Sequence, residues 1–542
     1  MNKIVVLGMD GATWNVLSPL IAQDKLPNLK KLREKSAWAE LDSTVPPLTP
    51  PAWTSAFTGK NPGKHNIFDF TKNSREDYEL HLTSRLDRKA RAVWNAVSES
   101  GGKVVLMNVA HTFPPEKVNG VVISGFGTPE TDCDYTYPSE LKKDILKKHS
   151  DFRPGIPTSI IANNDTKEFL KILDSHTKTN FQVFTELYKE HSPELGVYVF
   201  DEMDRLMHFF WHCFDENHPR FEKSDFTEKF IQHFQLVDKL IGDFIETLPD
   251  DVYVMSFSDH GFGAVHSDIY LNNYLLEKGY IKLKEGADTE IKVTTSVKIK
   301  SLIVKLLEKI GVWKFYRDFR LKSIPVGTVW FLKNIDWEKT KAVMMSMAGK
   351  SIRLNVRDRD PIGAVNADEV VDLIENLKKD LLNLTDPNTG KKVITKIWRG
   401  TEVYSGEYSI YAPDLILETA PGYSFHHGFS DAVIKESTQH GRIRSGDHER
   451  FGTFVLSGKG VKAGKIENAK ITDIAPTILH ILGLSVSAAM DGEFLSAAFE
   501  EKWLDENPIN IVEEADWAAE TSSTSDEEEK QIEQQLKALG YL

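Results

Sequence analysis

Seven residues of this sequence are candidates to hold a metal ion or to attack an electrophile. Carboxylates and imidazoles are oxygen and nitrogen ligands suited to zinc, manganese or iron, and three histidines are too many for a calcium site. A threonine hydroxyl becomes a nucleophile when a metal ion or a base activates it. The candidates are Asp10, Thr49, Asp204, His208, Asp259, His260 and His448.

Each candidate alone also fits an ordinary structural role. Aspartate is a common turn former, and single histidines are frequent at loop and helix ends. A threonine before a proline commonly caps a helix. The functional hypothesis therefore depends on the elements that would bring these side chains together.

Two of the candidate segments directly follow apolar runs that are typical of buried strands. Asp10 follows the run 4–7, and the pair Asp259 and His260 follows the run 251–257. In an open α/β sheet, ligands bind beyond the carboxyl ends of the parallel strands. We therefore expect these side chains at one edge of a sheet.

A third apolar run, residues 196–200, leads into a segment that contains Asp204 and His208. If a helix follows this strand, the two residues stand at positions i and i+4 and share one helix face. They could then bind one metal ion together. Asp201 and His212 flank the pair and are the competing choices.

The last candidate ligand, His448, comes shortly before the apolar run 452–458. It stands in a Gly-Asp-His sequence near an expected strand. His426, His427 and His440 are the alternatives to it.

The candidate nucleophile Thr49 precedes Pro50 and Pro51. Proline is tolerated in the first turn of a helix, so this segment predicts a loop that ends at a helix start. Unpaired backbone N–H groups and the positive end of the helix dipole favour an anion there, and a phosphate would fit. Helix capping alone is the other interpretation of Thr49.

Length and composition predict a large globular protein. The chain has 542 residues, of which 41% are hydrophobic and 27% charged, with a net charge of −14. Residues 501–542 carry −9 of this charge, and the remaining −5 argues against binding of a nucleic-acid polymer. Cys133 and Cys213 have no CxxC spacing, which indicates neither a disulfide framework nor a thiolate metal site. With no apolar run long enough for a transmembrane segment or a signal peptide, the cytoplasm is the expected location.

Changes in pattern along the chain predict four parts. Residues 1–285 form the first part of a core, and residues 341–500 form its second part. Between them, residues 286–340 are expected to form an inserted basic helical cap, and residues 501–542 an acidic C-terminal extension. The basic stretch 292–323 has nine Lys and Arg residues against two acidic ones. It fits a helix packed on the core, a cap that attracts an anionic substrate, or peripheral contact with an anionic membrane.

The candidate residues occur in a series of ordered motifs. The chain begins with a strand that leads into Gly-Met-Asp-Gly, and a Thr-Pro pair and Thr-Gly-x-x-Pro-x-x-His follow. Asp-x-x-x-His, Ser-Asp-His-Gly and Gly-Asp-His come later in that order. This series resembles the alkaline phosphatase superfamily, and specifically its type I phosphodiesterase/nucleotide pyrophosphatase-like branch. The similarity covers about residues 1–275 and 335–500.

The resemblance implies a three-layer α/β sandwich with a large, mostly parallel sheet and two divalent metal ions, zinc first and manganese second. It implies that one ion is bound by Asp10, Thr49, Asp259 and His260, and the other by Asp204, His208 and His448. It further suggests that Lys64, His65 and Asn66 contact the substrate. The number of subunits stays open.

The activity that the resemblance implies is metal-dependent hydrolysis of a small phosphate ester, with a phosphodiester or nucleotide-like substrate favoured. Thr49 would attack phosphorus and form a phosphothreonine intermediate. A phosphomutase or a phosphomonoesterase of the same superfamily is one alternative. A non-catalytic scaffold or membrane-surface protein is an alternative of another class. Sulfatase chemistry is disfavoured, because it requires a Cys or Ser where this chain has Thr49.

Overall fold

The computed structural model describes residues 1–129, 133–156, 166–287, 332–346, 350–426, 428–439, 442–513, 528 and 531–533. Most of the expected cap, the whole basic stretch 292–323 and most of the acidic extension lie outside the described residues, as do His427 and His440. None of the described helices combines the length and the apolar character that crossing a membrane requires.

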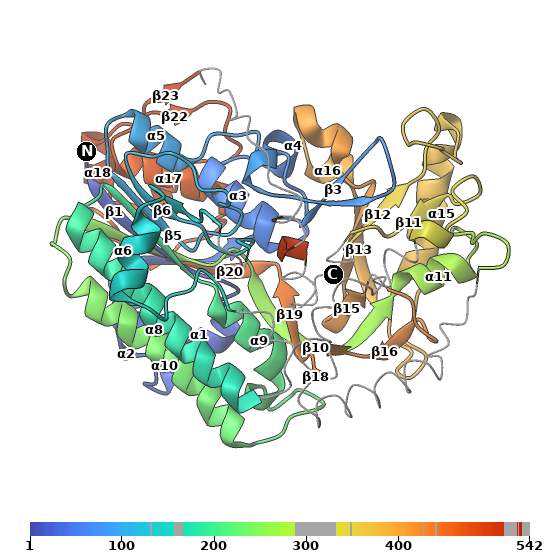
Figure 1. Ribbon diagram of the computed structural model, residues 1–542, viewed down its shortest axis with the longest axis horizontal. Helices are drawn as coiled ribbons and strands as arrows, with labels where there is room; N and C mark the ends of the chain where they lie inside the picture. Colours follow the sequence, from blue (N-terminus) through green and yellow to red (C-terminus); the bar gives the residue numbers. More distant parts are fainter. Residues whose placement is uncertain are drawn as a thin grey trace.

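A large sheet forms the centre of one lobe of the molecule, here called the main lobe (Figure 1). Its central strands, from β9 to β6, run parallel, and the strands at both edges include antiparallel pairs. In the described part of the chain, nine strands join it in the order β21 (Gly464–Lys465), β2 (Ala37–Asp42), β20 (Phe451–Ser457), β9 (Val252–Phe257), β1 (Lys3–Met9), β8 (Leu195–Phe200), β5 (Val104–Met107), β6 (Gly120–Ile123) and β7 (Thr136–Tyr137).

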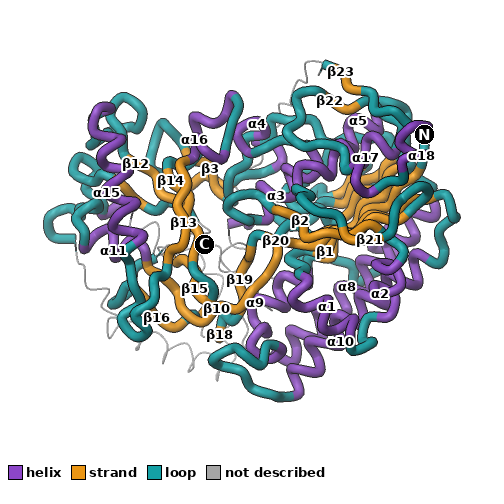
Figure 2. The backbone as a smooth tube through the Cα atoms, turned by 180° about the vertical axis from the view of Figure 1, so that it is seen from behind, coloured by secondary structure: helices purple, strands orange, loops and turns teal. Residues whose placement is uncertain are grey.

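Helices cover both faces of this sheet (Figures 1 and 2). One face carries α1 (Trp14–Ala22), α2 (Pro27–Glu34), α6 (Leu141–Lys148), α8 (Thr166–His191), α9 (Glu202–Phe214) and α10 (Asp225–Ile245). The other face carries α3 (Thr49–Thr58), α5 (Val93–Glu99), α17 (Ile474–Ile481) and α18 (Glu501–Glu506). The structure therefore confirms the expected three-layer α/β sandwich with a large, mostly parallel sheet.

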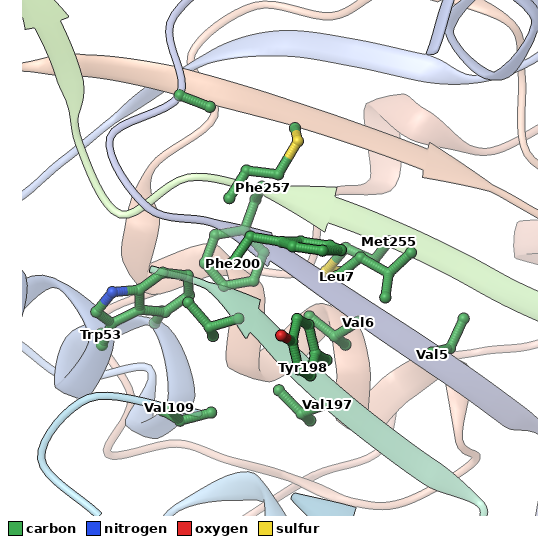
Figure 3. Close-up of a cluster of buried hydrophobic side chains, with 14 of the residues drawn as sticks. Val5, Val6, Leu7, Trp53, Val109, Val197, Tyr198, Phe200, Met255 and Phe257 are labelled. Carbon is green, nitrogen blue, oxygen red and sulfur yellow. The ribbon is translucent and has the colours of Figure 1, made fainter. Parts of the chain in front are cut away.

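The sequence pattern explains why these elements form. Strands β8 and β9 are buried along their whole length, as expected for parallel strands covered on both faces. Helix α10 buries apolar residues at helical spacing, so one of its sides faces the sheet. Figure 3 shows side chains of the core that result, among them Trp53 of α3, whose ring packs against that of Phe257.

A second lobe is built on a long strand that follows β9 of the main sheet in the chain. This strand, β10 (Gly261–Tyr270), starts immediately after His260 and pairs with β19 (Gly446–Glu449), β15 (Gly422–His426) and β16 (Ile434–Glu436). Another sheet of this lobe has the order β11 (Ala342–Val343), β12 (Ser351–Leu354), β14 (Leu415–Thr419) and β13 (Ile394–Arg399). Together with α11 (Leu271–Glu277) and α15 (Val370–Leu382) it encloses a hydrophobic core of its own.

The predicted second part of the core, residues 341–500, thus divides between the two lobes. The apolar sequence of β14 is typical of a buried strand, and β14 pairs with β12 and β13 and not with the main sheet. The strand expected at 452–458 is β20, which does join the main sheet. An apolar run shows that a strand is buried, but it does not show which sheet the strand joins.

Several further short helices and strands occur in the described part of the chain. They are α4 (Pro62–His65), β3 (Thr71–Asn73), β4 (Leu80–Leu82), α16 (Gly400–Val403), β17 (Thr438–Gln439), β18 (Arg442–Ile443), β22 (Val486–Ser487) and β23 (Ile511–Val512).

Replacement of Phe184 by alanine tests the packing of the main core. Phe184 of α8 is fully buried against Tyr198 and Phe244. We expect the change Phe184→Ala to lower the free energy of unfolding by about 3–5 kcal/mol, because it leaves a cavity among aromatic rings. Lys178→Ala, at an exposed position of the same helix, should change it by less than about 0.5 kcal/mol. Urea unfolding measures both, and equal midpoints for the two variants would contradict this packing.

Candidate metal centre

Three adjacent strands of the main sheet end in acidic residues. In the order β9-β1-β8, the strands lead directly into Asp259, Asp10 and Asp201. Because the strands are parallel, these carboxylates come to the same edge of the sheet. The side chains are buried, with Asp259 at 0% and Asp10 at 3% exposure. The expected recurrence of acidic residues at one sheet edge is confirmed.

Helix α9 follows β8 and brings two more candidates to this edge. Asp204 and His208 stand one turn apart on the helix, and Oδ1 of Asp204 lies 3.4 Å from Nε2 of His208. Both side chains are buried. The predicted i, i+4 pair is therefore present, and its polar atoms face one another.

His448 reaches the same edge because of the direction of the strand that follows it. Strand β20 runs antiparallel to β9, so the start of β20 lies where β9 ends. Just before that start, Nε2 of His448 lies 3.0 Å from Oδ1 of Asp204 and 3.2 Å from Nε2 of His208. The ring of His448 also stacks on that of His260, with centroids 3.7 Å apart.

Thr49 lies at the N-terminus of helix α3, as the two prolines predict. The capping position is occupied by Leu48, and Thr49 is the first residue of the helix, so its hydroxyl is not the cap. Its Oγ1 lies 3.3 Å from Nε2 of His260, and the side chain is 3% exposed. The hydroxyl thus contacts the candidate ligands from the positive end of a helix dipole.

Each of the three histidines is oriented by a backbone carbonyl. In every case Nδ1 lies at hydrogen-bond distance from a carbonyl oxygen, which places the proton on Nδ1 and leaves the lone pair of Nε2 directed at the cluster. This arrangement is typical of histidines that bind metal through Nε2. The carbonyl oxygens belong to Gly446, Gly261 and Pro47, at 2.9, 3.0 and 3.3 Å from Nδ1 of His208, His260 and His448.

Two of the carboxylates have an oxygen that finds no hydrogen-bond donor within the described residues. Asp10 accepts a hydrogen bond on Oδ2 from the Trp53 indole at 3.2 Å, and Asp259 accepts one on Oδ1 from the Gly11 N–H at 3.2 Å. Their other oxygens, Oδ1 of Asp10 and Oδ2 of Asp259, are buried without such a partner. A buried, unpaired carboxylate oxygen is costly, and a bound cation would remove that cost.

The pKa values of Asp10 and His260 are shifted in the directions expected for a buried cluster that lacks a bound cation. Burial and the neighbouring charges of Asp259 and Asp204 raise the pKa of Asp10 well above its usual value. Burial and the charge of His448 lower the pKa of His260 well below its usual value. A divalent cation among these atoms would favour ionised carboxylates and neutral imidazoles. The donor set and its charge therefore fit a metal centre.

The candidate residues form two overlapping groups, and within each group the potential ligand atoms lie within 4.8 Å of one another. One group is Asp204, His208 and His448, as predicted, and the other is Asp10, Asp204 and His260. Asp204 belongs to both groups, whereas the resemblance to the superfamily implied that it binds one ion only. Asp259 lies beside the second group, with Oδ2 3.3 Å from Nε2 of His260.

The alternative ligands take part in other interactions. Asp201 pairs with Arg205, whose Nη2 lies 2.8 Å from Oδ2 of Asp201, and both side chains are buried. Asp201 therefore takes part in a buried ion pair on α9. Nδ1 of His212 lies 3.0 Å from Oγ of Ser445, and His426 lies in β15 of the second lobe.

The three predicted substrate contacts are not brought to this cluster. Lys64 donates hydrogen bonds to Asp491 at 2.6 Å and to the Ala489 carbonyl, and Asn66 donates one to the Asp87 carbonyl. The reason is the length of α3, whose ten residues span about 15 Å between Thr49 and the segment that follows. His65 is fully buried against this helix, where its Nε2 lies 2.9 Å from Oγ of Ser55.

Trp53 is a residue of the site that the sequence analysis did not identify. It stands four positions after Thr49 on α3, so the two side chains share one face of the helix. Its indole N–H holds Asp10, and its ring packs against Phe257 with centroids 5.1 Å apart. The i, i+4 spacing from Thr49 was the signal in the sequence.

The variant His448→Ala tests whether the cluster binds metal. We expect it to lose about one of two bound ions, because one group of ligands would keep only Asp204 and His208. Metal analysis after dialysis against zinc or manganese gives the content. His426→Ala is the matched control and should retain the metal content of the unchanged protein. Unchanged content in His448→Ala would contradict this role of His448.

The sequence model of the family described as type I phosphodiesterase / nucleotide pyrophosphatase matches residues 4–446. No curated protein sequence matched the chain.

Solved structures with the same fold include murine ectonucleotide pyrophosphatase/phosphodiesterase 5, with a TM-score of 0.50 at 11% identity, covering 92% of this chain and 100% of that one. A structure of its inactive threonine-to-alanine variant in complex with AMP gives a TM-score of 0.51 at 11% identity, with the same coverage. Phosphonoacetate hydrolase from Sinorhizobium meliloti, in complex with phosphonoacetate, gives 0.52 at 11% identity, covering 89% of this chain and 95% of that one. At this identity the likeness concerns the fold, whereas the family match covers most of the sequence. The chain belongs to the type I phosphodiesterase / nucleotide pyrophosphatase family.

Proposed function

We propose that this protein hydrolyses small phosphate esters, phosphodiesters in preference, through a covalent intermediate on Thr49 that depends on two divalent metal ions. The observation that carries the proposal is the orientation of His208, His260 and His448. All three direct Nε2 at buried carboxylates, beside a threonine at a helix N-terminus.

The two ligand groups suit two neighbouring ions. Asp204, His208 and His448 would hold one, and Asp10, Asp259 and His260 would hold the other together with Thr49, with Asp204 between them. Mixed carboxylate and imidazole ligands favour zinc, and manganese is the second choice. When bound, such ions supply Lewis-acid stabilisation of the negative charge on the attacking and leaving oxygens.

The chain itself supplies the nucleophile and its surroundings. Oγ1 of Thr49 would attack phosphorus in line with the leaving oxygen, so that a P–O bond to Thr49 forms as the ester P–O bond breaks. The hydroxyl proton of Thr49 passes to water, and the departing oxygen takes up a proton from water. Because Pro50 and Pro51 have no N–H, the N-terminus of α3 offers the phosphoryl oxygens the Thr49 N–H and the positive end of its dipole. Water then cleaves the bond to Thr49 and restores the hydroxyl.

The comparisons support the chemistry at the level of the family. The family name describes phosphodiester and nucleotide pyrophosphate cleavage, and two structures of similar fold are described with AMP and with phosphonoacetate. One of them is described as inactive after a threonine was replaced by alanine, which supports a catalytic threonine in a protein of this fold. Hydrolysis of a phosphorus-containing small molecule is therefore the reaction that we assign to this site.

Replacement of the nucleophile tests the mechanism. We expect Thr49→Ala to lower kcat on a model phosphodiester such as bis(4-nitrophenyl) phosphate by at least about a thousandfold, because no other group can form the covalent bond. Its metal content should stay nearly unchanged. Thr49→Ser, which keeps a hydroxyl, is the control and should retain measurable turnover. Full activity in Thr49→Ala would overturn the assignment.

Isotope-labelled water distinguishes hydrolysis from phosphoryl transfer to a second hydroxyl. For hydrolysis we expect one oxygen-18 atom in each released product phosphate, because water cleaves the phosphothreonine bond. Mass spectrometry of the product after turnover in labelled water measures this. A phosphorylated product without the label would indicate a mutase instead.

A further inference from the structure

A cavity of about 460 Å³ lies between the two lobes, beside the candidate metal centre. Its wall on the main lobe is formed by Pro46 and Pro47, which immediately precede the Thr49 helix, and by the segment around His448. Strands β13 and β14 of the second lobe form the opposite wall. A volume of this size accommodates a small organic group.

The cavity is lined mainly by apolar and aromatic side chains. Trp398, Tyr423, Phe425 and Phe451 contribute rings, and Pro421 and Leu417 add apolar surface. Phe451 is 53% exposed, which is unusual for a large apolar side chain in this molecule. An apolar group of a ligand would find complementary surface on several sides.

Lys350 adds a buried positive charge to this cavity. Its side chain is 10% exposed, and its Nζ donates one hydrogen bond, to the His448 carbonyl at 3.2 Å. An ammonium group has three donors, so two have no acceptor within the described part of the chain. The nearest carboxylate oxygen, Oδ2 of Asp447, is 3.9 Å away and already accepts a hydrogen bond from Oγ of Ser424.

Other charges of the cavity lie closer to solvent. Glu449 and Lys396 are exposed, and Glu418 is half-buried. Arg450 is paired with Asp42. Charges in contact with water are screened, whereas a buried charge acts through a lower effective dielectric constant. The ammonium of Lys350 therefore has the stronger influence on a ligand inside the cavity.

Lys350 and Pro47 also connect the cavity with the metal centre. Nζ of Lys350 donates to the carbonyl oxygen of His448, and the carbonyl oxygen of Pro47 lies 3.3 Å from Nδ1 of the same histidine. His448 also lines the cavity itself. A small molecule bound in the cavity would therefore lie next to this candidate metal-binding residue. The cavity is adjacent to the place where the phosphorus atom would be attacked.

We propose that this cavity binds the organic group of the phosphoester, and that Lys350 pairs there with a second acidic group, a carboxylate or a phosphate. This inference rests on the proposed function of Thr49. The substrate class that it names is a phosphoester whose organic part is largely apolar and carries its own negative charge at a distance from the scissile bond. Lys350 is the residue that selects it.

Paired substrates test this selection. Methyl 4-carboxyphenyl phosphate and methyl 4-carbamoylphenyl phosphate differ in one charge, and methyl 4-phosphonophenyl phosphate distinguishes a phosphate-like group from a carboxylate. We expect the change Lys350→Met to raise KM for the acidic esters about tenfold or more, the effect of one charge-assisted hydrogen bond. KM for the carbamoyl ester should change less than about twofold, and kcat should be nearly unchanged for all three.

The control variants separate recognition from support of His448. Lys350→Arg, which keeps the charge, should restore most of the preference for acidic esters. Lys379→Met removes an exposed lysine from helix α15 of the same lobe and should leave every KM unchanged. Equal losses on acidic and neutral esters in Lys350→Met, together with lower metal content, would overturn the proposal, because Lys350 would then only support His448.

Binding to an inactive variant keeps this test independent of turnover. Calorimetry with Thr49→Ala should show tighter binding of the carboxyphenyl ester than of the carbamoyl ester, and the double variant with Lys350→Met should lose that difference. If the unchanged protein cleaves none of the esters but this difference is found, the mechanism of Thr49 fails and the binding site stands. If the esters are cleaved without any difference in KM or in binding, the binding site fails and the mechanism stands.

Discussion

Neutralisation of buried carboxylates is the constraint on which the site depends. Asp10, Asp204 and Asp259 are drawn to one place by the ends of two parallel strands and the start of α9, and burial removes the water that would otherwise stabilise their charge. Neighbouring imidazoles compensate only in part. A cluster of this kind is stable in its ionised form when cations are bound, so the same sheet geometry that creates the electrostatic cost also creates the binding site.

The backbone carbonyls beneath the histidines are the second component of this arrangement. Gly261 and Gly446 belong to β10 and β19, which pair with each other, and Pro47 belongs to the loop before Thr49. Their carbonyl oxygens determine which nitrogen of each ring faces the cluster. The backbone therefore determines the orientation of the imidazoles, and a bound metal ion is not needed to orient them.

The sequence predicted the parts of the fold and site that follow from local pattern. Strands β1, β8 and β9 are apolar runs with polar residues directly after them, and Asp204 and His208 have the spacing of one helix turn. The shared position of Asp204 could not be predicted, because it depends on where α9 is placed relative to β1.

Other features depend on contacts between segments that are distant in the sequence. Lys64, His65 and Asn66 follow Thr49 closely in the chain, yet α3 carries them away from the cluster. Strand β14 gave the pattern of a buried strand without indicating its sheet. Lys350 has no motif around it, and only the approach of the two lobes places it beside His448.

The pairing of β10 with β19 has a consequence for how this protein can diversify. Gly261 pairs with Glu449 and Phe262 with His448, so the chain enters and leaves the second lobe through one short ladder that begins next to two candidate ligands. We expect that segments beyond this ladder can be lengthened, shortened or exchanged with little displacement of His260 or His448, provided that the ladder and the contact of Lys350 with His448 are kept. With the function that we propose, the metal centre and the cavity that selects the substrate are separable modules, and evolution or an engineer can vary the second while preserving the first.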